Sequence, residues 1–151
     1  MKKIYGYCRI STKGQSIERQ IRNIIKEFPE ADIVEEVYTG TSLNRANWSK
    51  LKKKLKKDDT VVFDSVSRMS RNSEEGIKEY FELLDNGIHL VFLKERYINT
   101  ETYKKAIEVQ LEKTGNKIVD VYINATNEVF RILAEEQIKI AFEQSEKEVM
   151  D

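Results

Sequence analysis

The stretch Tyr5-Gly6-Tyr7-Cys8-Arg9-Ile10-Ser11-Thr12-Lys13-Gly14-Gln15 sets how the rest of the chain is interpreted. It begins with the β-branched and aromatic residues that pleated strands accept, so we predict a central strand from Lys2 to Cys8. The polar run that follows, with its glycine, predicts a loop. Arg9 and Ser11 would then lie where a strand ends, which is the edge at which open α/β sheets bind ligands. A nucleophilic serine beside an anion-binding arginine is one interpretation of this pair.

The composition describes one ordinary globular domain. The chain has 151 residues, of which 40% are hydrophobic and 34% are charged, and its formal net charge is zero. It contains no apolar run long enough to span a membrane, and its single cysteine excludes an internal disulfide and fits a reducing cytoplasm. One histidine and one cysteine make a His/Cys metal site implausible. With zero net charge, any surface that binds nucleic acid has to be local.

The chain after the opening stretch alternates helices and strands. Apolar stripes at helical spacing predict helices over residues 16–28, 47–55 and 74–86, with Ser16 and Ser73 as N-caps. Apolar and β-branched runs predict strands over residues 33–38, 60–63 and 88–93, and a short extra strand over 95–98. This order predicts an α/β fold, a three-layer α/β/α sandwich with a mostly parallel central sheet.

The last third of the chain has a different pattern. Residues 102–112 indicate a helix, and Thr114-Gly115-Asn116 ends it. The segment 117–151 has no glycine or proline, which predicts a helix of roughly 50 Å at about 1.5 Å per residue. Two neighbouring apolar stripes indicate that the domain covers one side and a partner the other, although packing wholly on its own domain is the alternative. Beyond Glu135 the pattern turns polar, and we expect that part to extend past the core.

Four arginines follow predicted parallel strands, so all four should face one edge of the sheet: Arg9, Arg45, Arg68 and Arg71. Guanidinium groups stay charged and present forked donors that match phosphate oxygens. The edge is therefore predicted to bind phosphate, and a serine hydroxyl there could attack a phosphodiester while the arginines neutralise its oxygens. The lysines at 52–54 and 56–57 remain open between a solvated helix face and a DNA-backbone patch.

Several common catalytic sites do not fit the sequence. No Gly-rich run ends in Lys-Ser/Thr, which disfavours an NTPase. Cys8 is predicted to be a small buried strand residue, and His89 stands at the start of a strand away from the arginines. Without them, no Ser/His/Asp triad can form.

The motif Tyr-x-Arg-x-Ser-Thr-x-x-Gln at residues 7–15 resembles the nucleophile motif of serine site-specific recombinases, the resolvase/invertase family. Gln20 falls where that family has a glutamine in its first helix, and Asn44-Arg45 follows a loop of small residues. The run Ser67-Arg68-Met69-Ser70-Arg71-Asn72 resembles the family's Asp-Arg-x-x-Arg motif. The resemblance covers residues 2–99 in order and spacing.

The resemblance implies an enzyme, a DNA strand-transferase in which Ser11 attacks a DNA phosphate and forms a 5′-phosphoserine link. Arg9, Arg68 and Arg71 would bind the scissile phosphate, while Arg45 and Gln20 would support the site. It also implies that DNA is the partner, that the helix 117–151 forms a homodimer, and that dimers pair into a tetramer on synapsis. No metal or other cofactor is implied.

The resemblance also sets expectations for domains and for departures. It implies a catalytic core over residues 1–99, a short helix and linker over 100–116, and the long helix over 117–151, with the family's C-terminal DNA-binding domain absent. Ser67 stands where many members carry aspartate, and Asp64 is a possible substitute. Two other hypotheses stay open: a catalytically inactive recombinase-fold protein that acts as a dimerising regulator, and an unrelated flavodoxin-like domain that binds a small phosphorylated ligand.

Overall fold

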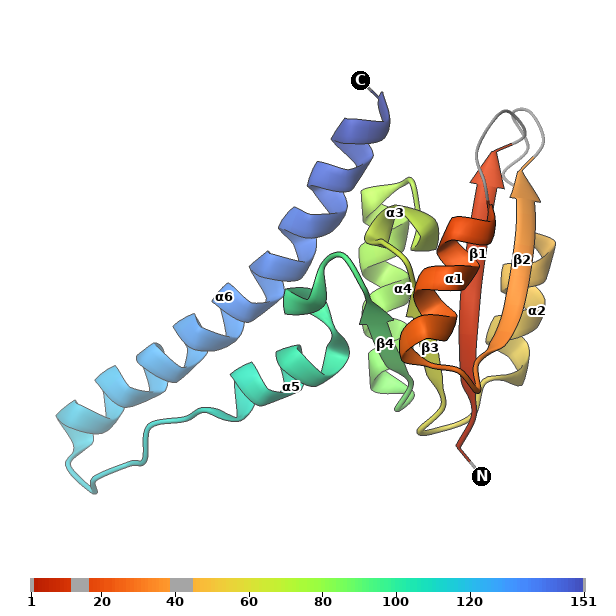
Figure 1. The fold of residues 1–151 in the computed structure, drawn as a ribbon. Coiled ribbons are helices and arrows are strands. Elements are labelled where there is room, and N and C mark those ends of the chain that lie inside the picture. The colour runs from red at the N-terminus through yellow and green to blue at the C-terminus, as the bar shows by residue number, and fades with distance from the viewer. Residues whose placement is uncertain (1, 12–16, 39–44, 151) are drawn as a thin grey trace.

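The structure, a computed structural model, describes residues 2–11, 17–38 and 45–150 (Figure 1). Its strands are β1 (Ile4–Ser11), β2 (Asp32–Tyr38), β3 (Thr60–Phe63) and β4 (His89–Phe92). Its helices are α1 (Ile17–Glu27), α2 (Ala46–Lys54), α3 (Val66–Met69), α4 (Ser73–Asp85), α5 (Thr100–Glu108) and α6 (Lys117–Met150), with a 3-10 turn, η1 (Arg96–Ile98), before α5.

The four strands form one parallel sheet in the order β2-β1-β3-β4, so β1 lies inside the sheet. Two apolar clusters cover its faces. Cys8, Ile24 and Val62 pack on the α1 side. The larger cluster joins residues of β1, β3 and β4 to α2, α4 and α6. Figure 1 shows α2 and α4 on the face of the sheet opposite α1. The predicted three-layer α/β/α sandwich with a parallel sheet is confirmed.

β1 is longer at its C-terminal end than the sequence predicts. Parallel pairing with β2 continues through the Arg9–Glu36 and Ser11–Tyr38 positions. Arg9 and Ser11 are therefore strand residues, and the prediction that they lie beyond the strand, which would end at Cys8, is wrong. Backbone pairing fixes their spacing more firmly than a loop would.

Three local predictions differ from the structure. The run 64–72, expected as a loop, contains α3, whose first N–H, that of Val66, donates to Glu95 Oε1 at 2.8 Å. Residues 95–98 form the turn η1 and not a strand. The N-cap of α4 is Asn72, whose side chain accepts from the N–H of Glu75, so Ser73 is the first helical residue and not the cap. Ser16, the other expected cap, lies outside the described residues.

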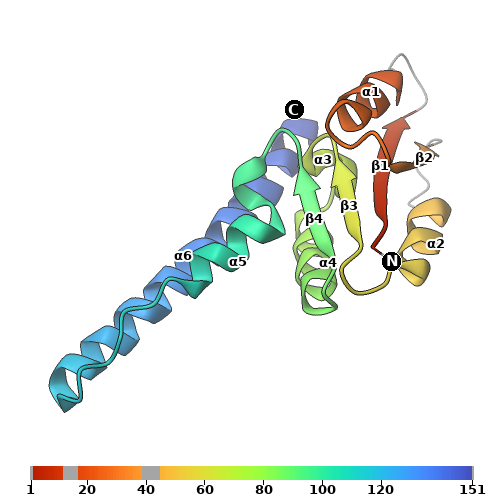
Figure 2. The same cartoon turned by 60° about the horizontal axis from the view of Figure 1, so that its bottom comes forward.

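The helix α6 is as long as the sequence predicts. Its C-terminal half is the buried one, whereas the sequence predicted that the N-terminal half would be covered. Ile138, Ala141, Phe142 and Ser145 lie at spacings of 3, 1 and 3 and are buried, so this stripe packs on the domain next to α3 and α4. The first half projects away from the sheet (Figures 1 and 2). The expectation that the part beyond Glu135 extends past the core is wrong, because a narrow apolar stripe inside a charged sequence is enough to dock it.

The segment between α5 and α6 runs back along the projecting half of α6 (Figure 2). The Leu111 N–H donates to Asn127 Oδ1 at 2.9 Å, and Asn127 Nδ2 donates to the Leu111 carbonyl at 3.1 Å. Asp120 accepts from the N–H groups of Thr114 and Gly115 at 2.7 and 3.0 Å. These bonds hold the connection in an extended form, and α5 ends at Glu108, earlier than the expected 112. No helix in the described ranges is both long and apolar enough to cross a membrane.

Candidate functional site

The site is built around Arg9, which is 3% exposed at the C-terminal end of β1. Its N–H donates to Gln20 Oε1 at 3.0 Å, and Gln20 Nε2 donates back to the Arg9 carbonyl at 2.9 Å. Gln20 is itself buried in α1. The amide of Gln20 therefore replaces a strand partner and fixes the first turns of α1 against the end of β1.

The segment after β3 brings a second arginine to the same place. Arg9 Nη2 donates to the Ser67 carbonyl, and Arg68 Nη1 donates to the Arg9 carbonyl at 3.2 Å. The Ser67 hydroxyl is engaged elsewhere, 2.8 Å from the Ser65 hydroxyl. Ser67 thus contacts Arg9 through its backbone, a contact that does not depend on which side chain stands at this position.

The arginines at this edge interact electrostatically. Burial lowers the pKa of Arg9 to about 10, and the positive charges of Arg45, Arg71 and Arg68 act in the same direction, while Tyr7 opposes them. Burial also lowers the pKa of Arg68, which the charge of Asp64 raises and that of Arg71 lowers. The cluster is therefore a region of concentrated positive charge, and a bound anion would relieve the repulsion.

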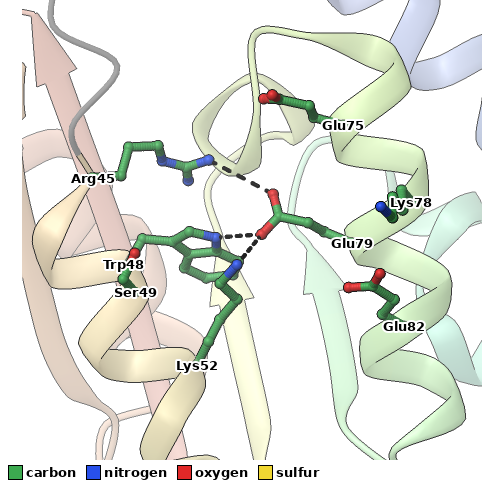
Figure 3. A pocket seen from close by; sticks show the side chains of 8 residues that line it. All are labelled: Arg45, Trp48, Ser49, Lys52, Glu75, Lys78, Glu79 and Glu82. Atoms are coloured by element: carbon green, nitrogen blue, oxygen red, sulfur yellow. Dashed lines mark hydrogen bonds and ion pairs between the residues drawn. The ribbon is translucent and has the colours of Figure 1, made fainter.

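Arg45 enters from the start of α2, where it is the N-cap residue. Its guanidinium carbon lies 5.4 Å from the centre of the Tyr7 ring and 5.1 Å from that of Trp48, which is the range of cation–π contacts. Its Nη1 lies 4.0 Å from Glu79 Oε1 in α4 (Figure 3). Its Nε and Nη2 atoms are buried and have no hydrogen-bond partner among the described residues.

A buried carboxylate, Glu36 in β2, holds the strand and the helix together. It is 4% exposed, and its Oε1 accepts from the Tyr7 hydroxyl at 2.8 Å and from the backbone N–H of Trp48 at 3.0 Å. Its Oε2 accepts from the Asn47 N–H at 3.1 Å. The bonds to Asn47 and Trp48 satisfy free backbone N–H groups in the first turn of α2. The N-cap residue, Arg45, makes no such bond because its side chain has no acceptor atom. Burial raises the pKa of Tyr7, so the phenol stays a donor to this carboxylate.

The structure brings most of the predicted site residues together. Arg9, Gln20 and Arg68 are in direct contact, and the charges of Arg45 and Arg71 are felt at Arg9. The backbone of Ser11 is paired opposite Tyr38, two residues beyond Arg9. The Ser11 side chain, residues 12–16 and residues 39–44 lie outside the described part of the chain.

The structure places Cys8 and His89, which were expected to be structural, away from solvent and away from the arginines respectively. Cys8 is fully buried on the α1 side, and burial raises the pKa of its thiol to about 12. His89 is the first residue of β4, at the opposite end of the sheet from the arginines, with its Nε2 3.6 Å from Asp58. The buried Asp64 accepts from Asn23 Nδ2 at 2.9 Å and lies 3.4 Å from Lys94 Nζ. Asp64 therefore links α1 to the residues after β4.

Glu36 and Glu79 are two residues that sequence reasoning missed. Two consecutive acidic residues in a short strand, Glu35 and Glu36, were the available signal for the first, because one of them has to face the sheet's interior. Glu79 gives no such signal in a helix rich in glutamate. Among the lysines of α2, Lys52 pairs with Glu79 and Lys54 lies over the Tyr5 ring. No group of three or more His, Cys, Asp or Glu side chains in the described ranges is arranged to hold a metal ion.

Comparison with known proteins gives consistent matches. The family described as Resolvase, N terminal domain matches residues 4–119. A resolvase from Clostridium perfringens (strain 13 / Type A) is 30% identical over 98 residues, covering 64% of this chain and 52% of the relative. The transposon Tn21 resolvase of Escherichia coli is 30% identical over 90 residues, covering 60% of this chain and 46% of the relative.

One more curated protein and one solved structure are similar to this chain. The serine recombinase PinR of Escherichia coli (strain K12) is 31% identical over 96 residues, covering 60% of this chain and 48% of the relative. The crystal structure of a resolvase family site-specific recombinase from Streptococcus pneumoniae aligns with 97% of this chain at 19% identity, covers 99% of that chain and has a TM-score of 0.46. The chain thus spans about half the length of the curated relatives that it matches.

Proposed function

Because this chain belongs to the resolvase N-terminal domain family, we propose that it is the catalytic domain of a serine recombinase that cleaves and rejoins DNA in site-specific recombination. The observation that carries the proposal is the contact of Arg9 with Arg68 and Gln20 at the end of the strand that also carries Ser11. A concentrated positive charge two residues from a serine fits phosphoryl transfer, which depends mainly on positioning and on neutralising phosphate oxygens.

Ser11 is the proposed nucleophile. Its Oγ attacks the phosphorus of the scissile phosphodiester, so a P–Oγ bond forms while the P–O3′ bond breaks. The serine loses its proton and the leaving 3′ oxygen gains one, which leaves a 5′-phosphoserine and a free 3′-hydroxyl. Because one phosphodiester replaces another, the reverse attack by a 3′-hydroxyl rejoins the strand without ATP.

The arginines would have different roles at the phosphate. Arg9 and Arg68, joined through the Arg9 carbonyl, would bind the non-bridging oxygens together with Arg71. Arg9 also has a lowered pKa, so it is a better proton donor than an exposed arginine and can assist protonation of the leaving oxygen. Gln20 would act by holding the Arg9 backbone, and Arg45 by adding charge from the β2 side.

The projecting half of α6 is the proposed dimer contact. Many of its large apolar side chains are exposed, with Ile118 at 72% and Tyr122 at 71%. A pocket of about 400 Å³ lies where this half meets α5, lined by Ala106, Val109, Phe130, Leu133, Ala134 and Gln137. An exposed apolar helix face of this length favours a second copy of the chain as its cover. Pairing of dimers into a tetramer on DNA follows as the proposed synaptic form.

A covalent-trapping experiment tests the chemistry. The chain is incubated with duplex DNA that carries nicks at varied positions, so that a cleaved strand diffuses away and religation is blocked. We expect a protein–DNA adduct that survives denaturing electrophoresis. Absence of any adduct, with the chain still dimeric, would favour a catalytically inactive, dimerising regulator with the same fold.

A further inference from the structure

The carboxylate of Glu79, in α4, accepts hydrogen bonds from two side chains of α2. Its Oε2 accepts from Trp48 Nε1 at 2.8 Å and from Lys52 Nζ at 2.6 Å (Figure 3). The side chain of Glu79 is 16% exposed. The two bonds hold Oε2 in place and leave the other oxygen, Oε1, to face Arg45.

Arg45 uses only one corner of its guanidinium on this carboxylate. The Nη1 atom lies 4.0 Å from Glu79 Oε1, whereas Nε and Nη2 are buried without a hydrogen-bond partner in the described ranges. Nε and Nη2 form the edge of a guanidinium whose two N–H groups point in parallel, and that edge matches two oxygens of a phosphate. Contact with the Tyr7 and Trp48 rings, both of which the guanidinium covers, restricts the plane of the group further.

We propose that Glu79 is a positioning residue that holds Arg45 by Nη1, so that the buried Nε/Nη2 edge is left without a partner among the described residues and can pair with two oxygens of a phosphate. The proposal deepens the phosphate site and rests on the proposed function. Glu79 does not touch the phosphate. It acts through Arg45, while Lys52 and the Trp48 indole keep its carboxylate in place.

Two physical effects of Glu79 predict opposite signs for phosphate binding. As a bare negative charge, Glu79 repels phosphate, so neutralising it should tighten binding. As a positioning group, it spares Arg45 the entropy of being ordered on binding, so neutralising it should weaken binding. The sign of the change therefore separates positioning from simple charge.

The chain offers a direct probe because Trp48 is its only tryptophan. Its single indole N–H signal, or its fluorescence, reports on Arg45 and Glu79 together. Inorganic phosphate is titrated into the full chain, the Glu79→Gln variant and a matched control, Glu82→Gln, which changes an exposed carboxylate of the same pocket. We expect Glu79→Gln to need about fivefold more phosphate, from the loss of one ordered side chain. Glu82→Gln should match the unchanged chain, and Arg45→Ala should lose the response.

The rate of adduct formation on nicked DNA gives an independent second measurement. Glu79→Gln should slow it about tenfold in the unchanged background and should have no further effect in the Arg45→Ala background, because a positioning residue acts only through the residue that it positions. Glu79→Asp, which keeps the charge on a shorter arm, should show the same direction in both assays and serves if Glu79→Gln does not fold.

The outcomes separate the two claims. If the unchanged chain forms no adduct, the proposed strand transfer fails, and the phosphate titration still decides the role of Glu79. Equal or tighter phosphate binding by Glu79→Gln, a Glu79 effect that persists without Arg45, or an indole signal that phosphate does not move would each overturn the proposal.

Discussion

Arg9 carries a charge at a position where burial alone would favour an apolar side chain. It is 3% exposed and surrounded by the charges of other arginines, and its pKa is lowered to about 10. Both this value and the unfolded one lie above neutral pH, so the cost to stability is fully present at pH 7 and is relieved only as pH rises above about 10. Such a cost is typical of a residue kept for function.

Replacing Arg9 by methionine should therefore stabilise the fold and abolish adduct formation. The gain from removing a buried charge is partly offset by the lost bond to the Ser67 carbonyl, so we expect the free energy of unfolding to rise by about 1 kcal/mol. Urea denaturation measures the change, with Arg22→Met, at an exposed position of α1, as the control. A loss of stability at Arg9→Met would contradict the account.

Cys8, next to Arg9, makes alkaline pH destabilising. Its thiol has a pKa raised from 9.0 to about 12, so the folded state favours the neutral form. This stabilisation is complete below pH 9 and is lost as pH rises from 9 to 12. From pH 7 to pH 10, the chain should lose about 1 kcal/mol more than Cys8→Ala does. Equal losses in urea denaturation of the two proteins would show that the thiol does not titrate in this way.

At the residue scale, the sequence predicted which charged side chains gather at the edge of the sheet, but it did not predict their hydrogen-bond partners. The four arginines were predicted to lie at one edge because they follow strands, and Gln20 because it matches a family motif; the structure places Arg9, Arg68 and Gln20 in contact. The role of Ser67 was not, since its contact with Arg9 goes through the backbone carbonyl and leaves no trace in side-chain chemistry. Glu36 and Glu79 were missed because their partners lie on other elements, at separations that no local pattern shows.

At the scale of elements, long helices and buried strands were predicted reliably, whereas the one-turn helix α3 and the turn η1 were not. The helices α1, α2 and α4 and the strand β3 lie within one or two residues of their predicted bounds. The one-turn helix α3 depends on Glu95, a residue far along the chain that satisfies its first N–H. The local sequence does not predict such a helix, because tertiary contacts supply its stability.

The crossing of α4 and α6 depends on Gly76. A Cβ at this position would lie 2.6 Å from Phe142 Cδ1 and 3.0 Å from Ser70 Cβ. Phe142 is buried and cannot move aside freely. Gly76→Ala should therefore cost about 2 kcal/mol in the free energy of unfolding, although alanine is the better helix former by about 1 kcal/mol. Urea denaturation against Lys78→Ala, on the exposed face of α4, measures it, and an unchanged or raised stability would exclude this tight crossing.

At the scale of the whole molecule, α6 divides the chain into a folded body and a projecting arm (Figure 1). The sequence predicted the length of the helix. It placed the N-terminal half of α6 against the core, because the apolar pattern of that half is wider than the one beyond Glu135. The domain covers the narrow stripe, and the wide one is left exposed.

Self-association should depend on this arm. Leu133 is 55% exposed and lines the pocket next to α5. We expect the chain to sediment as a dimer at micromolar concentration, and Leu133→Lys to sediment as a monomer with an unchanged circular dichroism spectrum. Val37→Lys, which removes an equally exposed apolar residue from the edge strand β2, should remain a dimer. A monomer across the whole concentration range for the unchanged chain would argue against the dimer.

The central claim, that this domain breaks DNA by making an ester on Ser11, is tested most directly by locating the ester. The adduct trapped on nicked DNA is digested with nuclease and protease, and the phosphorylated peptide is sequenced by mass spectrometry. We predict a single phosphoserine at residue 11, and no adduct from Ser11→Ala. An adduct that persists in Ser11→Ala, or phosphate on Ser65, Ser67 or Ser70, would contradict the account.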